Sequence, residues 1–99
     1  MLIAPIEINQ TASGGAWSFN TLKISGAYLS HILVVAAAVT TTFNVTITDE
    51  KSNIIYAEDG ITGTLREEVY IPLRGIYTIA VDTSSVADST FTGRLMLEE

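Results

Sequence analysis

Four carboxylates gather in the stretch ITDEKSNIIYAEDG, where they could ligate a metal ion or transfer a proton. They are Asp49, Glu50, Glu58 and Asp59, all within eleven positions. The residues around them predict turns, because Ser and Asn follow the first pair and Gly60 follows the second. A strand of about five or six residues between the two turns would separate the pairs by roughly 17–20 Å. We therefore expect solvated turn carboxylates and no metal site.

His31 is the only histidine and the other residue that could carry catalysis. It would need a nucleophile or a carboxylate held against it by the fold, and a hydrolase that uses His31 with a carboxylate is one alternative. Zinc is not expected, because one histidine without any cysteine could build a zinc site only with acids from elsewhere in the chain. The serines form no G-x-S-x-G motif. The sequence therefore predicts no catalytic residue, no cofactor and no enzymatic activity.

Length and composition limit the class of protein. The chain has 99 residues, enough for one domain over residues 1–99. Its 11 acidic residues outnumber 5 scattered basic ones, for a net charge of −6, so we expect no nucleic-acid partner. The longest apolar run, Ile32–Val39, has eight residues, whereas a membrane helix needs about 20, so we expect no membrane partner. Only 16% of the residues are charged, which favours packing against other subunits.

Short apolar or alternating segments recur between Gly, Ser, Asn and Asp residues, which predicts strands and no helix. The predicted strands are Leu2–Ile8, Ala16–Ser25, Ala27–Ala38, Thr41–Asp49, Asn53–Glu58, Glu67–Leu73, Ile76–Asp82 and Thr90–Glu98. This spacing is typical of an all-β fold, a single antiparallel β-sandwich of about eight short strands. A jelly-roll-like connectivity is one solution. Short links favour a local meander among the last five strands, and the connectivity of the first three is open.

Two local features refine the prediction. Pro5 cannot donate a ladder hydrogen bond, so the first strand is expected at the edge of a sheet. The apolar residues change phase after Phe19, which predicts a bulge near Asn20 and Thr21.

The segment Ala27–Ala38 is apolar on both faces. Such a strand is either covered on both sides within a sheet or contributes to a subunit interface. Tyr70 alternates with Val69 and Ile71, so we expect an exposed ring there. The candidate interface residues are Leu29, His31, Leu33, Val35 and Tyr70.

Three short motifs lie within residues 40–85. They are a T-D-E turn, a G-x-x-G-T link and an I-P-x-x-G-x-Y-T strand entry, formed by Thr48, Asp49 and Glu50; Gly60, Gly63 and Thr64; and Ile71, Pro72, Gly75, Tyr77 and Thr78. With these motifs, residues 40–85 resemble small all-β virion structural proteins of tailed bacteriophages, in which the turn has the form T-x-D-E.

The resemblance implies a non-enzymatic capsid decoration (cement) protein, with a neck or tail component as a variant. It implies a virion location after synthesis in the host cytoplasm, and the major capsid protein or other virion subunits as partners. A homo-oligomer, such as a trimer, is expected. A carbohydrate-binding or adhesion module that uses exposed tyrosines is the alternative from another class of protein.

Overall fold

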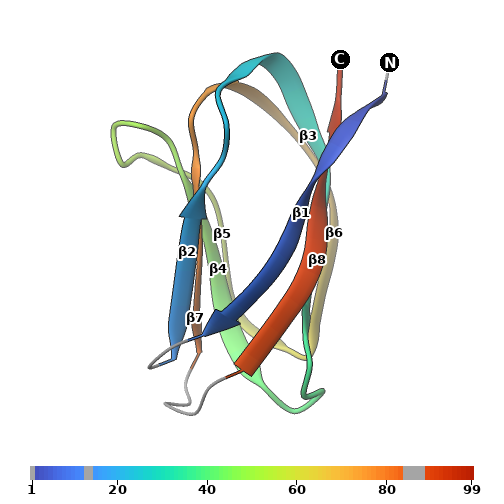
Figure 1. Ribbon diagram of the computed structural model, residues 1–99, viewed down its shortest axis with the longest axis vertical. Helices are drawn as coiled ribbons and strands as arrows, with labels where there is room; N and C mark the ends of the chain where they lie inside the picture. Colours follow the sequence, from blue (N-terminus) through green and yellow to red (C-terminus); the bar gives the residue numbers. More distant parts are fainter. Residues whose placement is uncertain (1, 13–14, 84–88) are drawn as a thin grey trace.

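The computed structural model of the protein describes residues 2–12, 15–83 and 89–99. These residues form two antiparallel sheets of four strands each, packed face to face (Figure 1), so the predicted all-β sandwich is confirmed. None of them belongs to a helix that could cross a membrane. The strands are β1 (Leu2–Ala12), β2 (Ala16–Asn20), β3 (Ile24–Ala36), β4 (Thr42–Thr48), β5 (Ile54–Thr62), β6 (Thr64–Gly75), β7 (Thr78–Thr83) and β8 (Ser89–Glu98).

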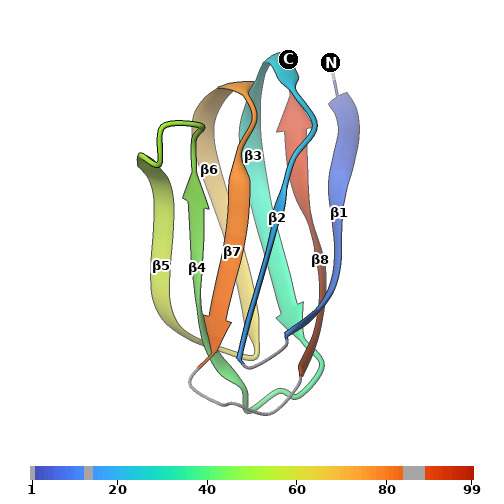
Figure 2. The ribbon, with the colours of Figure 1, turned by 60° about the vertical axis from the view of Figure 1, so that its left-hand side comes forward.

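The order of the strands is that of a jelly roll. One sheet, called here the β3 sheet, has the order β1-β8-β3-β6, and the other, the β4 sheet, has the order β2-β7-β4-β5. Strands that follow one another along the chain therefore lie in opposite sheets, except for the hairpin of β4 and β5 (Figure 2). The jelly-roll-like connectivity is confirmed. The meander expected for the last five strands is wrong, because the links from β5 to β8 all cross between the sheets.

The core lies between the sheets and follows the alternation of side chains along the strands. Phe43, Val45 and Ile47 of β4 are buried, while Asn44 between the first two is exposed. Phe91 of the β3 sheet packs against rings of the β4 sheet. Its centroid lies 5.2 Å from that of Phe43 and 5.8 Å from that of Trp17. These tilted and edge-on ring contacts join the two sheets.

The change of phase after Phe19 marks a crossing between sheets. β2 ends at Asn20 and β3 begins at Ile24 in the other sheet, so the bulge predicted near Asn20 and Thr21 is wrong. Thr21 fixes the crossing, because its backbone N–H donates to the carbonyl of Tyr77 at 2.8 Å and its hydroxyl accepts the Tyr77 N–H at 3.0 Å. A chain that leaves its sheet also changes which residues face the core, and the sequence pattern alone does not separate this case from a bulge.

The turn predicted at Asp59 and Gly60 is also wrong, because β5 continues through both residues. The pairing of β4 with β5 shifts in register between Phe43 and Val45, where Asp59 and Gly60 face a single residue of β4, Asn44. Gly60 has a φ of 69°, and its N–H donates to Oδ1 of Asn44 at 2.9 Å. The Asp-Gly pair therefore forms a β-bulge, another place where glycine provides a positive φ.

β1 lies at the edge of the β3 sheet, as the proline predicted. The pairing of β1 with β8 is irregular between Ile3 and Ile6. Pro5 therefore lies in an interruption of the ladder, where its missing N–H removes no regular hydrogen bond.

β8 approaches β3 so closely at Gly93 that the position has no room for a side chain. Its φ is 151°, and an added Cβ would collide with the carbonyl oxygen of Leu33 and lie 3.1 Å from Cα of Val34. We predict that Gly93→Ala lowers the free energy of unfolding by about 3 kcal/mol or more, through backbone strain and overpacking. Gly60→Ala is the control, because a Cβ there meets nothing within 4 Å and the positive φ costs only about 1–2 kcal/mol. Urea denaturation measures both changes, and equal losses would contradict the prediction.

Candidate functional site

The first acidic pair closes the β4–β5 loop. Oδ1 of Asp49 accepts the backbone N–H of Lys51 and that of Asn53, each at 2.9 Å, and the Asn53 side-chain amide donates to Oδ2 at 3.2 Å. The hydrogen bond from the Asn53 backbone, helped by the other two, lowers the pKa of Asp49. Asp49 is therefore a turn-forming carboxylate, as the sequence predicted.

Glu50 has a structural contact that the sequence did not predict. Its Oε1 accepts the backbone N–H of Ile76 at 2.9 Å. Because Ile76 lies in the link between β6 and β7, this hydrogen bond ties the β4–β5 loop to a crossing between the two sheets. The Glu50 side chain therefore stabilises the fold at this point.

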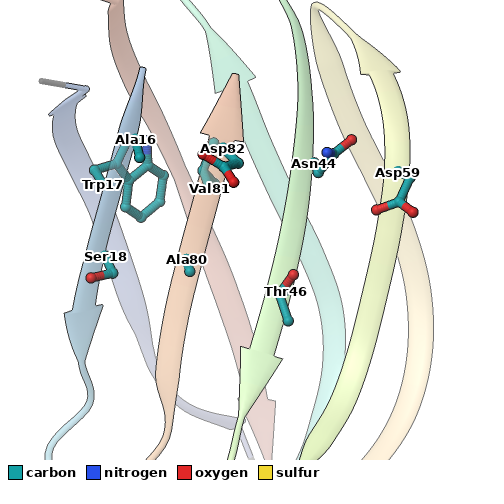
Figure 3. A pocket seen from close by; sticks show the side chains of 9 residues that line it. All are labelled: Ala16, Trp17, Ser18, Asn44, Thr46, Asp59, Ala80, Val81 and Asp82. Carbon is teal, nitrogen blue, oxygen red and sulfur yellow. The ribbon is translucent and has the colours of Figure 1, made fainter. Parts of the chain in front are cut away.

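The second acidic pair lies elsewhere, and its Asp59 borders an open hollow on the outer face of the β4 sheet (Figure 3). The hollow has a volume of about 560 Å³. Asp82 of β7 and Asp59 of β5 stand on either side of Asn44 of β4. The small side chain of Ala16 on β2 lies beside Asp82, and that of Ala80 lies further along β7. No group of three or more His, Asp or Glu side chains that could hold a metal ion occurs in the described parts of the chain.

His31 contacts both a serine and a glutamate, which are the residue types of a hydrolytic triad. Its Nδ1 lies 3.3 Å from Oγ of Ser30, and its Nε2 lies 3.5 Å from Oε1 of Glu68. The hydroxyl of Ser30 is a poor nucleophile here, because the residue is only 7% exposed and the hydroxyl donates to the carbonyl of Met96 at 3.2 Å. The contacts orient the His31 ring on the outer face of the β3 sheet.

Ser30 lies at an irregularity that changes which residues of β3 face outward. The register of β3 shifts between Leu29 and His31 against both β6 and β8. Leu29 is therefore fully buried in the core, and its prediction as an interface residue is wrong. A single extra residue reverses the face to which every later side chain points. His31 is exposed and Leu33 and Val35 are half-buried, so these three candidates do lie on the outer face.

This surface, the outer β3 face, consists of rows of side chains that run across the strands. The row at Leu33 places Arg94 of β8 on one side of it and Arg66 of β6 on the other, with Glu7 of β1 beyond Arg94. The neighbouring rows place Met96 and Glu68 beside His31, and Thr92 and Thr64 beside Val35. Side chains directly opposite one another on paired strands are about 5 Å apart at Cβ, so each row forms a continuous surface.

Two tyrosine rings extend the outer β3 face at one end. Tyr70 is 72% exposed, and its ring centroid lies 4.6 Å from that of Tyr28 at a tilt of 44°. The Tyr28 hydroxyl donates to Oε1 of Glu98 at 3.4 Å. Burial, and then the Glu98 carboxylate, raise the pKa of the Tyr28 hydroxyl. The exposure of Tyr70 is as predicted, and Tyr28 is an addition that the sequence did not single out.

A separate apolar groove of about 640 Å³ runs beside the β2–β3 crossing. Ile6, Phe19 and Ile24 line it and also pack against the core. Leu22 lies in the crossing and is 90% exposed. The groove is therefore the outer boundary of the core at this end of the sandwich.

Comparison with known proteins extends only to the fold. No protein-family model and no curated protein matches the chain. A structure of infectious bursal disease virus, Gx strain, is similar with a TM-score of 0.48 and 10% identity over 94% of this chain and 28% of that chain. Dimeric latent PorU from Porphyromonas gingivalis is similar with a TM-score of 0.46 and 9% identity over 99% of this chain and 13% of that one.

The Yersinia pseudotuberculosis-derived mitogen YPM is similar with a TM-score of 0.41 and 12% identity over 92% of this chain and 86% of that one. The present chain spans less than a third of the viral and PorU chains. A viral structure is thus among those with a similar all-β arrangement, and at these TM-scores the likeness carries no argument about function. The resemblance to tailed-phage proteins stays a prediction from the sequence.

The lowered pKa of Asp49 allows a test of how much its hydrogen bonds stabilise the turn. A carboxyl whose pKa is lower in the folded state stabilises the fold above its unfolded pKa, and this stabilisation is lost as the pH falls through the folded pKa. We predict that Asp49→Ala lowers the unfolding temperature at pH 7, and that the difference from the wild type shrinks as the pH falls below the ordinary aspartate value of 3.8. Thermal unfolding followed by circular dichroism from pH 7 to pH 2 measures it. Glu99→Ala is the control, and a difference that does not change with pH would contradict the prediction.

Proposed function

We propose that this protein is a non-enzymatic structural protein of a tailed-phage virion, and specifically a decoration (cement) protein that binds and stabilises the capsid shell. Its partners are the major capsid protein or other virion subunits, and its location is the virion, after synthesis in the host cytoplasm. The observation that carries the proposal is the composition of the outer β3 face.

The outer β3 face has the residue types that are enriched where proteins bind one another. Tyrosine, methionine and arginine are over-represented in protein interfaces relative to other surfaces, and this face combines all three types around Leu33 and Val35. The arginines flank apolar side chains, so a partner would bury an apolar centre within a polar rim. A broad sheet face of this kind favours contact with a protein surface over the enclosure of a small substrate.

The virion part of the proposal rests on the sequence resemblance over residues 40–85, which spans β4 to β7. Many copies on a symmetric shell multiply weak contacts, because each further contact of a linked array forms at high effective concentration. The low content of charged residues, 16%, suits such repeated packing. A neck or tail component would use the same kind of surface at another place on the particle.

Capsid shells assembled with and without this protein test the decoration role. We predict that shells assembled without this protein lose surface density in electron micrographs and break at a lower temperature or at low salt. Adding back the wild-type protein restores both properties. Adding back Val35→Asp restores them at about tenfold or higher protein concentration, because a charge at the apolar centre of the face must be desolvated on binding. Shells that keep the same density and resistance without the protein would contradict the proposal.

A carbohydrate-binding role is the second candidate, and the Tyr28–Tyr70 pair is the observation that favours it. Exposed aromatic rings offer an apolar face and a hydroxyl at one place. We predict for this role that the isolated protein binds a consistent set of sugars on a glycan array and that Tyr70→Ala weakens the binding at least tenfold. Ile54→Ala, at a large apolar residue that is 65% exposed on β5, is the control. Absence of binding by the wild-type protein would remove this candidate.

A further inference from the structure

The charges of the protein are distributed unevenly between the outer β3 face and the rest of the chain. The central rows of that face carry two arginines, Arg66 and Arg94, and two glutamates, Glu7 and Glu68. The sequence has three further basic and nine further acidic residues. The centre of the face is therefore electrically balanced, while the rest of the molecule carries the whole net charge of −6.

The four charged side chains of these rows are also available to a partner. Each belongs to an exposed residue. Within the described residues, the only ion contact of this face is the one between His31 and Glu68, at 3.5 Å, and the Glu68 side chain is 86% exposed. Neither arginine forms a salt bridge in the described part of the chain.

Two copies of an acidic protein repel one another through most of their surfaces. The outer β3 face is different, because each copy presents there both a basic and an acidic side chain for the other. We propose that a second copy of this chain packs against the outer β3 face, with Arg66 of each copy opposite Glu68 of the other. This inference rests on the proposed structural role and specifies it: the virion subunit that covers the outer β3 face is a second copy of this chain.

A two-fold axis satisfies this arrangement. Arg66 and Glu68 are two residues apart on β6 and point to the same side, about 7 Å from one another along the strand. An axis that runs across the strands, midway between the rows of Leu33 and His31, places each Arg66 opposite Glu68 of the second copy. Both contacts form at once, since a two-fold interface is self-complementary.

The same axis also brings apolar side chains together. It stacks the two β3 strands antiparallel, with Leu33 opposite His31 of the second copy. Val35 then lies toward the Tyr28–Tyr70 ring pair of that copy, two rows away on the other side of the axis. Burial of these side chains supplies most of the affinity, and the charge pairs set the register and exclude other partners.

Two reversed-charge variants test the inference. The Arg66→Glu variant has acidic residues at both positions 66 and 68 of β6. The Glu68→Arg variant has basic residues at both. We predict that the wild-type protein sediments as a dimer and that each variant alone dissociates at least tenfold more readily. An equimolar mixture of the two variants recovers the dimer mass, because an acidic β6 then faces a basic one. Sedimentation velocity or light scattering after gel filtration measures the mass of each sample.

Lys51→Glu is the matched control, since it makes the same change of charge in the exposed β4–β5 loop, and it keeps the wild-type dimer. A monomeric or trimeric wild-type protein, or a mixture that stays dissociated, would overturn the inference. The outcome is separable from that of the proposed function. A monomer that still stabilises shells overturns the dimer and keeps the cement role, whereas a dimer without effect on shells keeps the dimer and removes that role.

Discussion

The contact of Phe91 in the β3 sheet with Trp17 and Phe43 in the β4 sheet is the interaction on which the rest of the structure depends. Among the described strands, only β4 and β5 are neighbours both along the chain and within a sheet. Hydrogen bonds between consecutive strands therefore stabilise one hairpin, and every other link depends on contacts between distant parts of the chain. Burial of apolar side chains between the sheets supplies these contacts. The outer faces are not under this constraint, so their residues are available for binding.

The fold class and the inward residues of several strands could be predicted, because they depend on local alternation. Phe43, Val45 and Ile47 are an example, since the period of two indicates both the strand and its buried face. Leu29 could not be placed in the same way. A bulge is defined by one strand relative to its partner, and the partner of β3 at this point is Met96 of β8, which is distant in the sequence. The Asp-Gly pair of β5 was misplaced for the same reason, because Asn44 opposite it converts a turn motif into a bulge.

The charged rows of the outer β3 face were beyond prediction from the sequence as well. Glu7, Arg94 and Arg66 come from β1, β8 and β6, and only the register of three strand pairs aligns them with Leu33. In the sequence these residues are single charges, far apart and without a motif. The one available signal was that β3 is apolar on both faces, and Leu33 and Val35 do lie on its outer face. The sequence did not indicate which types of residue surround these outer side chains.

The irregularity at Ser30 connects these observations. In a regular strand, Tyr28 and His31 would point to opposite sides, because they are three positions apart. The register shift between Leu29 and His31 places both on the outer face, while Leu29 and Ile32 stay in the core. The bulge thus keeps the core of β3 apolar and at the same time joins the Tyr28 ring to the charged rows. It also explains why Ser30 can occupy a buried position, since its hydroxyl donates to the Met96 carbonyl on the strand against which β3 bulges. The surface proposed here for binding is therefore a consequence of how β3 satisfies its core.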